Sequence, residues 1–175
     1  SSFQLNDTEG FEPTAATVLN LTQDHLDWHG DMASYGAAKG RVFGTRSLRV
    51  LRRDDASVGA WLVQPNSAPR RQENQSDAPL CITFGPDLPQ RPGDYGLEEV
   101  NGMTWLVRAL PAEETVGKRA RAIEEDLQIQ RLMPADALRI RGQHNALNAL
   151  AALALASTCT PHLAQLLHGL REYTG

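Results

Sequence analysis

The fold class can be inferred from residues 15–25, which read AATVLNL over residues 15–21 and TQDH over residues 22–25. The first seven residues form a continuous apolar run, a pattern typical of a strand that is buried on both faces of a parallel sheet. Polar side chains follow this run directly, and open α/β sheets bind ligands beyond the carboxyl ends of such strands. The sequence therefore predicts a buried strand that leads into a polar, ligand-binding loop.

The segments that follow this strand predict an α/β domain. Asp31 can cap a helix that continues, with apolar residues at helical spacing, to a break around Gly44. Residues 48–51 and 80–84 are two further apolar runs, and three strands with an intervening helix or loop favour a mostly parallel sheet flanked by helices. Residues 64–79 are polar and rich in proline, so we expect a mobile loop there.

The second half of the chain predicts a small antiparallel appendage and two closing helices. Residues 95–100 and 103–110 flank Asn101-Gly102, a strong hairpin signal. Residues 127–130 and 138–141 alternate like exposed strands. The helices are expected at residues 143–157 and 161–171, the second with Thr160 as its cap, Pro161 in its first position and a leucine stripe.

Composition limits the class of protein. The 175 residues fit one domain, and 41% hydrophobic with 22% charged residues is typical of a packed globular chain. A formal net charge of −4 has the wrong sign for binding a polyphosphate backbone, so no nucleic-acid partner is expected. No apolar run approaches the roughly 20 residues that a membrane span needs, so we expect none.

The cysteines and the chain ends suggest a location and an origin. Cys81 and Cys159 form no CxxC pair, which favours a reducing compartment, and we expect a cytoplasmic protein. The first residues carry neither an initiator Met nor a targeting pattern, and the chain ends abruptly. The sequence is therefore expected to be a piece of a longer protein.

Residues 24–29 read DHLDWH, with four potential ligands in six positions just past the first strand. Carboxylate and imidazole groups together suit a divalent ion, although the HxxxH spacing lacks the glutamate of a zinc protease. The alternative is a polar turn that caps the next helix.

Lys39 and Lys118 are the only lysines of the chain, and Lys39 falls near the expected apolar face of its helix. Such a side chain ordinarily extends its amine into water. The functional alternative is a desolvated amine that reacts with an electrophile.

Asn145 and Asn148 project from the same side of the first turns of the expected helix. Asparagine is a poor interior helix former, and its amide can bind the edge of a nucleotide base. The alternative is a helix cap plus one solvent-facing amide. A phosphate-binding GxxxxGK[ST] motif is absent from the sequence.

Four motifs in order carry a resemblance: SSFQL at residues 1–5, LNLTQDHLD at 19–27, YGAAK at 35–39 and GQHNALNALAA at 142–152. Together they resemble the Mur ligase family. The resemblance implies that residues 1–175 are the central, ATP-binding domain of a three-domain enzyme, without the N-terminal portion that carries its phosphate loop. It also implies an ATP- and Mg²⁺-dependent amide ligase of peptidoglycan synthesis that works through an acyl phosphate.

The resemblance assigns roles to individual residues. His25 would bind magnesium, and Lys39 would be carbamylated by carbon dioxide and help to hold the metal. Asn145 and Asn148 would contact adenine, and Ser1 would lie near the substrate. Arg52 departs from the asparagine of related sequences, the loop between His25 and Lys39 is shorter, and the glutamate that should precede Ser1 is missing.

Two other functions remain open on the sequence. The chain could come from a branch of the family that adds a different amino acid or acts on folate, because the central motifs are shared. It could also be a noncatalytic nucleotide-binding or interaction module. The missing neighbouring domains would distinguish these functions, and the piece alone is expected to have no ligase turnover.

Overall fold

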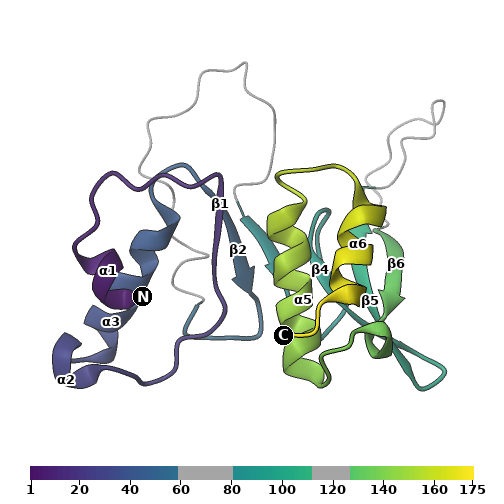
Figure 1. The fold of residues 1–175 in the computed structure, drawn as a ribbon, viewed down its shortest axis with the longest axis horizontal. Helices are drawn as coiled ribbons and strands as arrows, with labels where there is room; N and C mark the ends of the chain where they lie inside the picture. Colours follow the sequence, from purple (N-terminus) through teal and green to yellow (C-terminus); the bar gives the residue numbers. More distant parts are fainter. Residues whose placement is uncertain (59–80, 112–126) are drawn as a thin grey trace, which may run out of the picture.

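The computed structural model describes residues 1–58, 81–111 and 127–175, and its centre is one sheet of six strands (Figure 1). The strands lie side by side in chain order, β1 to β6. The first four are parallel to one another, whereas β4, β5 and β6 are antiparallel. This mixed sheet confirms the predicted α/β class with an antiparallel appendage. The strands are β1 Ala15–Val18, β2 Leu48–Arg52, β3 Cys81–Phe84, β4 Tyr95–Val100, β5 Met103–Leu110 and β6 Gln128–Pro134.

The helices fall into two groups (Figure 1). Three short helices near the N-terminus pack together on one side of β1, whereas two helices near the C-terminus pack on each other, the first of them across strands β1 to β4. The first group is α1 Ser2–Asn6, α2 Leu26–His29 and α3 Met32–Gly40, followed by the 3-10 turn η1 Arg41–Phe43; the second is η2 Ala135–Ala137, α5 Gln143–Ala156 and α6 Leu163–Glu172. None of the helices in the described ranges is long and apolar enough to cross a bilayer.

Strand β2 is buried on both faces, and this fixes three layers. Val50 and Leu51 are neighbours, so their side chains point to opposite faces, and both are 0% exposed. Val50 packs in the core cluster that contains the residues of α5. Leu51 packs with Val18 and Phe43 in a second cluster. Helix α5 therefore packs on one face of the sheet, and η1 packs on the other face, beside β1 and β2.

The expectation of a doubly buried strand at residues 15–21 is wrong. Strand β1 ends at Val18, its burial alternates along the chain, and Leu19 is 38% exposed. Among the described strands β1 has a single neighbour, β2, at the end of the sheet. Double burial belongs to β2 because that strand lies inside the sheet.

The hairpin prediction is confirmed residue by residue. Strands β4 and β5 have the expected bounds, and Val100 pairs with Met103 across the turn. Asn101 and Gly102 both have positive φ, 52° and 76°, which is the conformation that a two-residue type I′ turn requires.

Two expectations at the end of the chain need correction. Residues 138–141 form no strand: β6 continues to Pro134, η2 follows, and Leu138 lies in the core at 1% exposure. Helix α6 begins at Leu163, not at Pro161, and His162 occupies its N-cap position. The Thr160 hydroxyl accepts a hydrogen bond from the His162 N–H, so this side chain stabilises the turn before the helix. The expected loop at 64–79 lies outside the described residues.

Arg53 ties the end of β2 to the connection between β3 and β4. Its side chain is only 9% exposed, and its guanidinium donates to the Asp87 carboxylate at 2.8 Å and to the Tyr95 carbonyl at 2.8 Å. It also donates to the carbonyl oxygens of Asp87 and Leu88. Neighbouring Arg52 is more exposed and binds Asp54.

We predict that Arg53→Gln lowers the free energy of unfolding by about 1–3 kcal/mol, because it removes the bonds of a buried guanidinium and leaves the part-buried Tyr95 carbonyl without this donor. The matched change Arg52→Gln removes one surface ion pair and should cost less than about 1 kcal/mol. Urea denaturation followed by circular dichroism measures both values. Equal losses in the two variants would show that Arg53 is no more than a surface residue.

Candidate functional site

A cavity of about 370 Å³ opens where β1 ends, and it brings together two residues that the sequence singled out, Ser1 and Lys39. Helix α1 contributes one wall and the end of α3 another. The third wall is the end of β1 with the two residues that follow it, so the cavity lies at the carboxyl edge of the parallel strands. Its lining comprises Ser1, Ser2, Leu5, Thr17, Val18, Leu19, Asn20, Lys39 and Val42.

Two helix caps place Ser1 and Lys39. The Asp31 carboxylate accepts the Ser34 N–H at 2.7 Å and starts α3, as predicted. This bond lowers the pKa of Asp31, so the cap is present above that pKa and is lost as the pH falls through it. At α1 the Ser1 hydroxyl accepts the Gln4 N–H while the Gln4 side chain accepts from the backbone nitrogen of Ser1. The pair forms a capping box.

The Lys39 amine lies against an aromatic ring at the edge of this cavity. Its Nζ is 4.7 Å from the centroid of the Tyr35 ring, and Tyr35 is 3% exposed. The negative face of a ring attracts an ammonium group. The Lys39 side chain is half-buried and lines this open cavity, where a ligand can reach its amine.

His25 lies near this cavity but does not line it. It precedes α2 with a left-handed backbone, φ 53°, and its Nε2 is 3.3 Å from the Asp24 carboxylate. The His25 ring also contacts Phe3 of α1, with 4.8 Å between ring centroids. The side chain remains 46% exposed, so its imidazole is accessible to a ligand.

The asparagine pair lies on the other layer. The Asn145 side chain donates to the Arg141 carbonyl at 2.7 Å, which stabilises the start of α5, whereas Asn148 is exposed. Neither residue lines the Lys39 cavity. Helix α5 covers the face opposite η1, so a ligand that touches both Asn148 and Lys39 must cross the carboxyl edge of the sheet.

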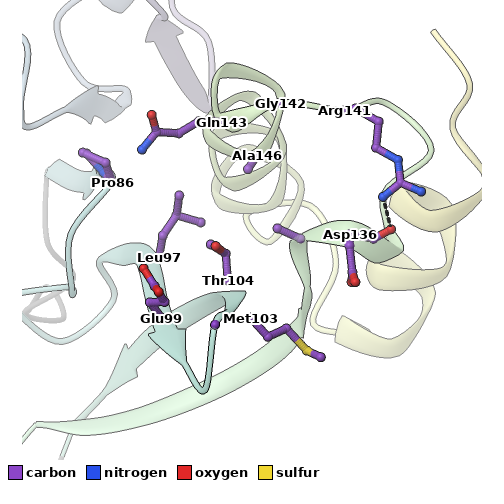
Figure 2. A pocket seen from close by; sticks show the side chains of 12 residues that line it. Pro86, Leu97, Glu99, Met103, Thr104, Asp136, Arg141, Gly142, Gln143 and Ala146 are labelled. Atoms are coloured by element: carbon purple, nitrogen blue, oxygen red, sulfur yellow. Dashed lines mark hydrogen bonds between the residues drawn. The ribbon is translucent and has the colours of Figure 1, made fainter.

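A larger cavity of about 570 Å³ lies between the first turn of α5 and the β4–β5 hairpin (Figure 2). Pro86, just past the end of β3, and Gln143 both line it and lie close together in this view, so the start of α5 is near the carboxyl edge. Arg141 donates to the Asp136 carbonyl beside it. The lining is Pro86, Leu97, Glu99, Gly102, Met103, Thr104, Ala135, Asp136, Arg141, Gly142, Gln143 and Ala146.

The described residues offer a magnesium ion few protein ligands. Within residues 1–58, 81–111 and 127–175, no three His, Cys, Asp or Glu side chains gather into a metal site. Magnesium takes few protein ligands when phosphates are present. A carbamate on Lys39 would add oxygen donors to the cavity.

The sequence reasoning missed helix α1 and the contact between Ser2 and His29. The Ser2 hydroxyl lies 3.0 Å from Nε2 of His29, and Ser2 is 4% exposed. The helix itself carried a signal, because Ser1 and Gln4 match the S-x-x-Q capping box. The contact between Ser2 and His29 has no such sequence signal, because the two residues are 27 positions apart.

The two asparagines should differ in their effect on stability. Asn145→Ala removes the bond to the Arg141 carbonyl and should lower the free energy of unfolding by about 1 kcal/mol. Asn148→Ala replaces an exposed residue by a better helix former and should leave stability unchanged or raise it by a few tenths of a kcal/mol, roughly. Urea denaturation of both variants checks this, and an equal loss at both positions would contradict it.

Known proteins resemble this chain in sequence and in fold. The profile of the Mur ligase middle domain matches residues 1–72. The UDP-N-acetylmuramoylalanine–D-glutamate ligases of Albidiferax ferrireducens and of a Polaromonas species are each 59% identical to the chain over all of its 175 residues. These residues make up 34% and 29% of the two relatives, so the chain spans about a third of the length of the curated relatives it matches.

A solved structure shares the fold. The crystal structure of MurF from Acinetobacter baumannii superposes with a TM-score of 0.50 over 94% of this chain and 30% of that one, at 18% sequence identity. This likeness supports the α/β architecture alone. The identity to the ligases over the whole chain, together with the profile match, confirms the resemblance seen in the motifs: the chain belongs to the Mur ligase family.

Proposed function

We propose that the chain is part of a cytoplasmic, ATP-dependent ligase that adds D-glutamate to UDP-N-acetylmuramoyl-L-alanine in peptidoglycan synthesis. The observation that carries the proposal is the cavity at the end of β1, where Ser1 and Lys39 meet. The D-glutamate ligases that are 59% identical to the chain support the choice of substrate. Residues 1–175 would be the central domain of this ligase without its N-terminal phosphate-loop portion, and the neighbouring domains would be its partners.

The nucleotide would lie across the carboxyl edge of the sheet. Lys39 lies beside the end of β1, and the start of α5 lies beside the end of β3. These strand ends are about 10 Å apart, because β2 lies between them and neighbouring strands are about 4.8 Å apart. An extended nucleoside triphosphate can bridge this separation, with adenine at Asn145 and Asn148 and its phosphates toward Lys39.

Of the two asparagines, Asn148 is the freer to bind adenine. Its amide is exposed, whereas the Nδ2 of Asn145 is already engaged by the Arg141 carbonyl. The side-chain oxygen of Asn145 can still accept from an exocyclic amine. The pair therefore offers an acceptor at Asn145 and both a donor and an acceptor at Asn148.

Lys39 would act as a carbamate. Its neutral amine attacks carbon dioxide, a nitrogen–carbon bond forms, and one proton passes to water. The product is an anion with two oxygen donors, which hard cations such as Mg²⁺ prefer. His25 would be the second protein ligand, and the bound ion would neutralise charge on the phosphate oxygens.

The reaction would proceed in two displacements. The substrate carboxylate attacks the γ-phosphorus of ATP, which forms an acyl phosphate and releases ADP. The amino group of D-glutamate then attacks the carbonyl carbon, an amide bond forms, phosphate leaves with the electrons of the carbon–oxygen bond, and a proton passes to solvent. Ser1, in the wall of the cavity, would hold the substrate near Lys39, since positioning supplies much of the rate in such transfers.

We predict that the chain in ¹³C-labelled bicarbonate shows a carbamate signal by ¹³C NMR that depends on Lys39. Lys39→Ala should abolish this signal. Lys118→Ala, a change at the only other lysine, should leave the carbamate signal intact. Any carbamate signal that remains in Lys39→Ala can then be assigned to the amino terminus. An identical spectrum for Lys39→Ala and the unaltered chain would contradict the assignment of Lys39.

We also predict that the chain alone binds Mg-ATP more weakly than micromolar and has no ligase turnover. The sequence contains no GxxxxGK[ST] motif, and without that loop most of the triphosphate charge is left without its usual backbone donors. Isothermal titration with Mg-ATP measures the affinity. A micromolar dissociation constant would show that residues 1–175 hold the phosphates without the missing portion.

A further inference from the structure

His29 occupies a junction between the two helices that wall the Lys39 cavity. It is the last residue of α2, and its Nε2 lies 3.0 Å from the buried hydroxyl of Ser2 in α1. Ser2 lines the cavity and is 4% exposed, so its polar group depends on this partner.

The His29 ring makes contacts on the α3 side as well. The centroids of the His29 and Tyr35 rings are 5.2 Å apart. The His29 ring also stacks on the ring of Phe3 in α1, with 5.8 Å between the centroids and 25° between the planes. Tyr35 in turn lies beneath the Lys39 amine, with 4.7 Å from Nζ to the ring centroid. A continuous series of contacts therefore runs from Ser2 through His29 and Tyr35 to Lys39.

The backbone around His29 holds this position. Gly30 follows with φ 84° and ends α2, and its N–H donates to the Leu26 carbonyl at 2.8 Å. Asp31 then caps α3 directly. Because α2 and α3 are separated by these two residues alone, His29 moves with the helix that carries Lys39.

From this geometry we infer that His29 is a positioning residue: it fastens α1 to α3, so that the serines at the start of α1 face the Lys39 amine. The role for Lys39 as a carbamate rests on the proposed function, whereas the fastening of α1 does not. Without the bond, α1 would be held by its apolar and ring contacts and by the hydrogen bond that Arg41 donates to the Asn6 carbonyl, and the cavity wall that Ser1 and Ser2 form would be less firmly placed.

The experiment compares three variants of the 175-residue chain. His29→Phe keeps a ring among Phe3 and Tyr35 but removes the bond to Ser2, Ser2→Ala removes the same bond from the other side, and His29→Gln keeps a group able to bond to Ser2. Hydrogen exchange of the α1 amides and the Lys39-dependent ¹³C carbamate signal are measured for each. Leu167→Ala, in the contact between α6 and the core, is a control for general loss of stability.

The expected result is a rise of tenfold or more in the exchange rate of the α1 amides in both His29→Phe and Ser2→Ala. The carbamate signal should fall several-fold in the same two variants, and a double variant that combines Ser2→Ala with His29→Phe should show no larger loss than either single variant. His29→Gln should recover a large part of both readouts, and Leu167→Ala should change neither beyond its effect on global unfolding.

Two outcomes separate the inference from the function on which it partly rests. If α1 exchanges at the original rate in His29→Phe and Ser2→Ala, the inference is overturned, whatever the carbamate signal does. If the unaltered chain forms no Lys39-dependent carbamate, the proposed role of Lys39 fails, while faster α1 exchange in the variants still supports His29 as the fastening residue.

Discussion

The double burial of β2 is the constraint on which the architecture depends. Val50 and Leu51 cannot both leave water unless helices cover each face of the sheet, and each buried aliphatic side chain is worth about 1.5–3 kcal/mol. Helix α5 meets this need on one face and η1 on the other. A ligand that contacted both groups of candidate residues would therefore lie across the carboxyl edge of the sheet.

Much of this architecture was predictable because its signals are local. Asn101-Gly102 specifies a turn through the backbone conformation of two adjacent residues, and Asp31 specifies a helix start through a bond to Ser34. Errors arose where burial depends on distant neighbours. Leu138 and Ile140 alternate with Arg139 and Arg141 like a strand, yet the apolar pair packs into the core while Arg139 binds Glu172 and Arg141 binds the Asp136 carbonyl.

In the candidate site too, features with a local sequence signal were predictable, whereas contacts between distant residues were not. The motifs named both Ser1 and Lys39 as candidate site residues, and in the fold both line the same cavity. From the sequence, His29 was identified only as one of four potential ligands, and its contact with Ser2 was not predicted because a hydrogen bond across 27 residues leaves no periodic pattern in the sequence. Identical side chains can thus have different roles here: His25 is exposed to ligands, whereas His29 is engaged with its neighbours.

Strand β1 has a consequence for the chemistry at Lys39. Among the described strands it pairs on one side only, with β2, so the main-chain donors and acceptors of its other side are free to extend the sheet. The same strand end forms a wall of the cavity. A strand that paired with this side of β1 would therefore change how much water reaches the Lys39 amine.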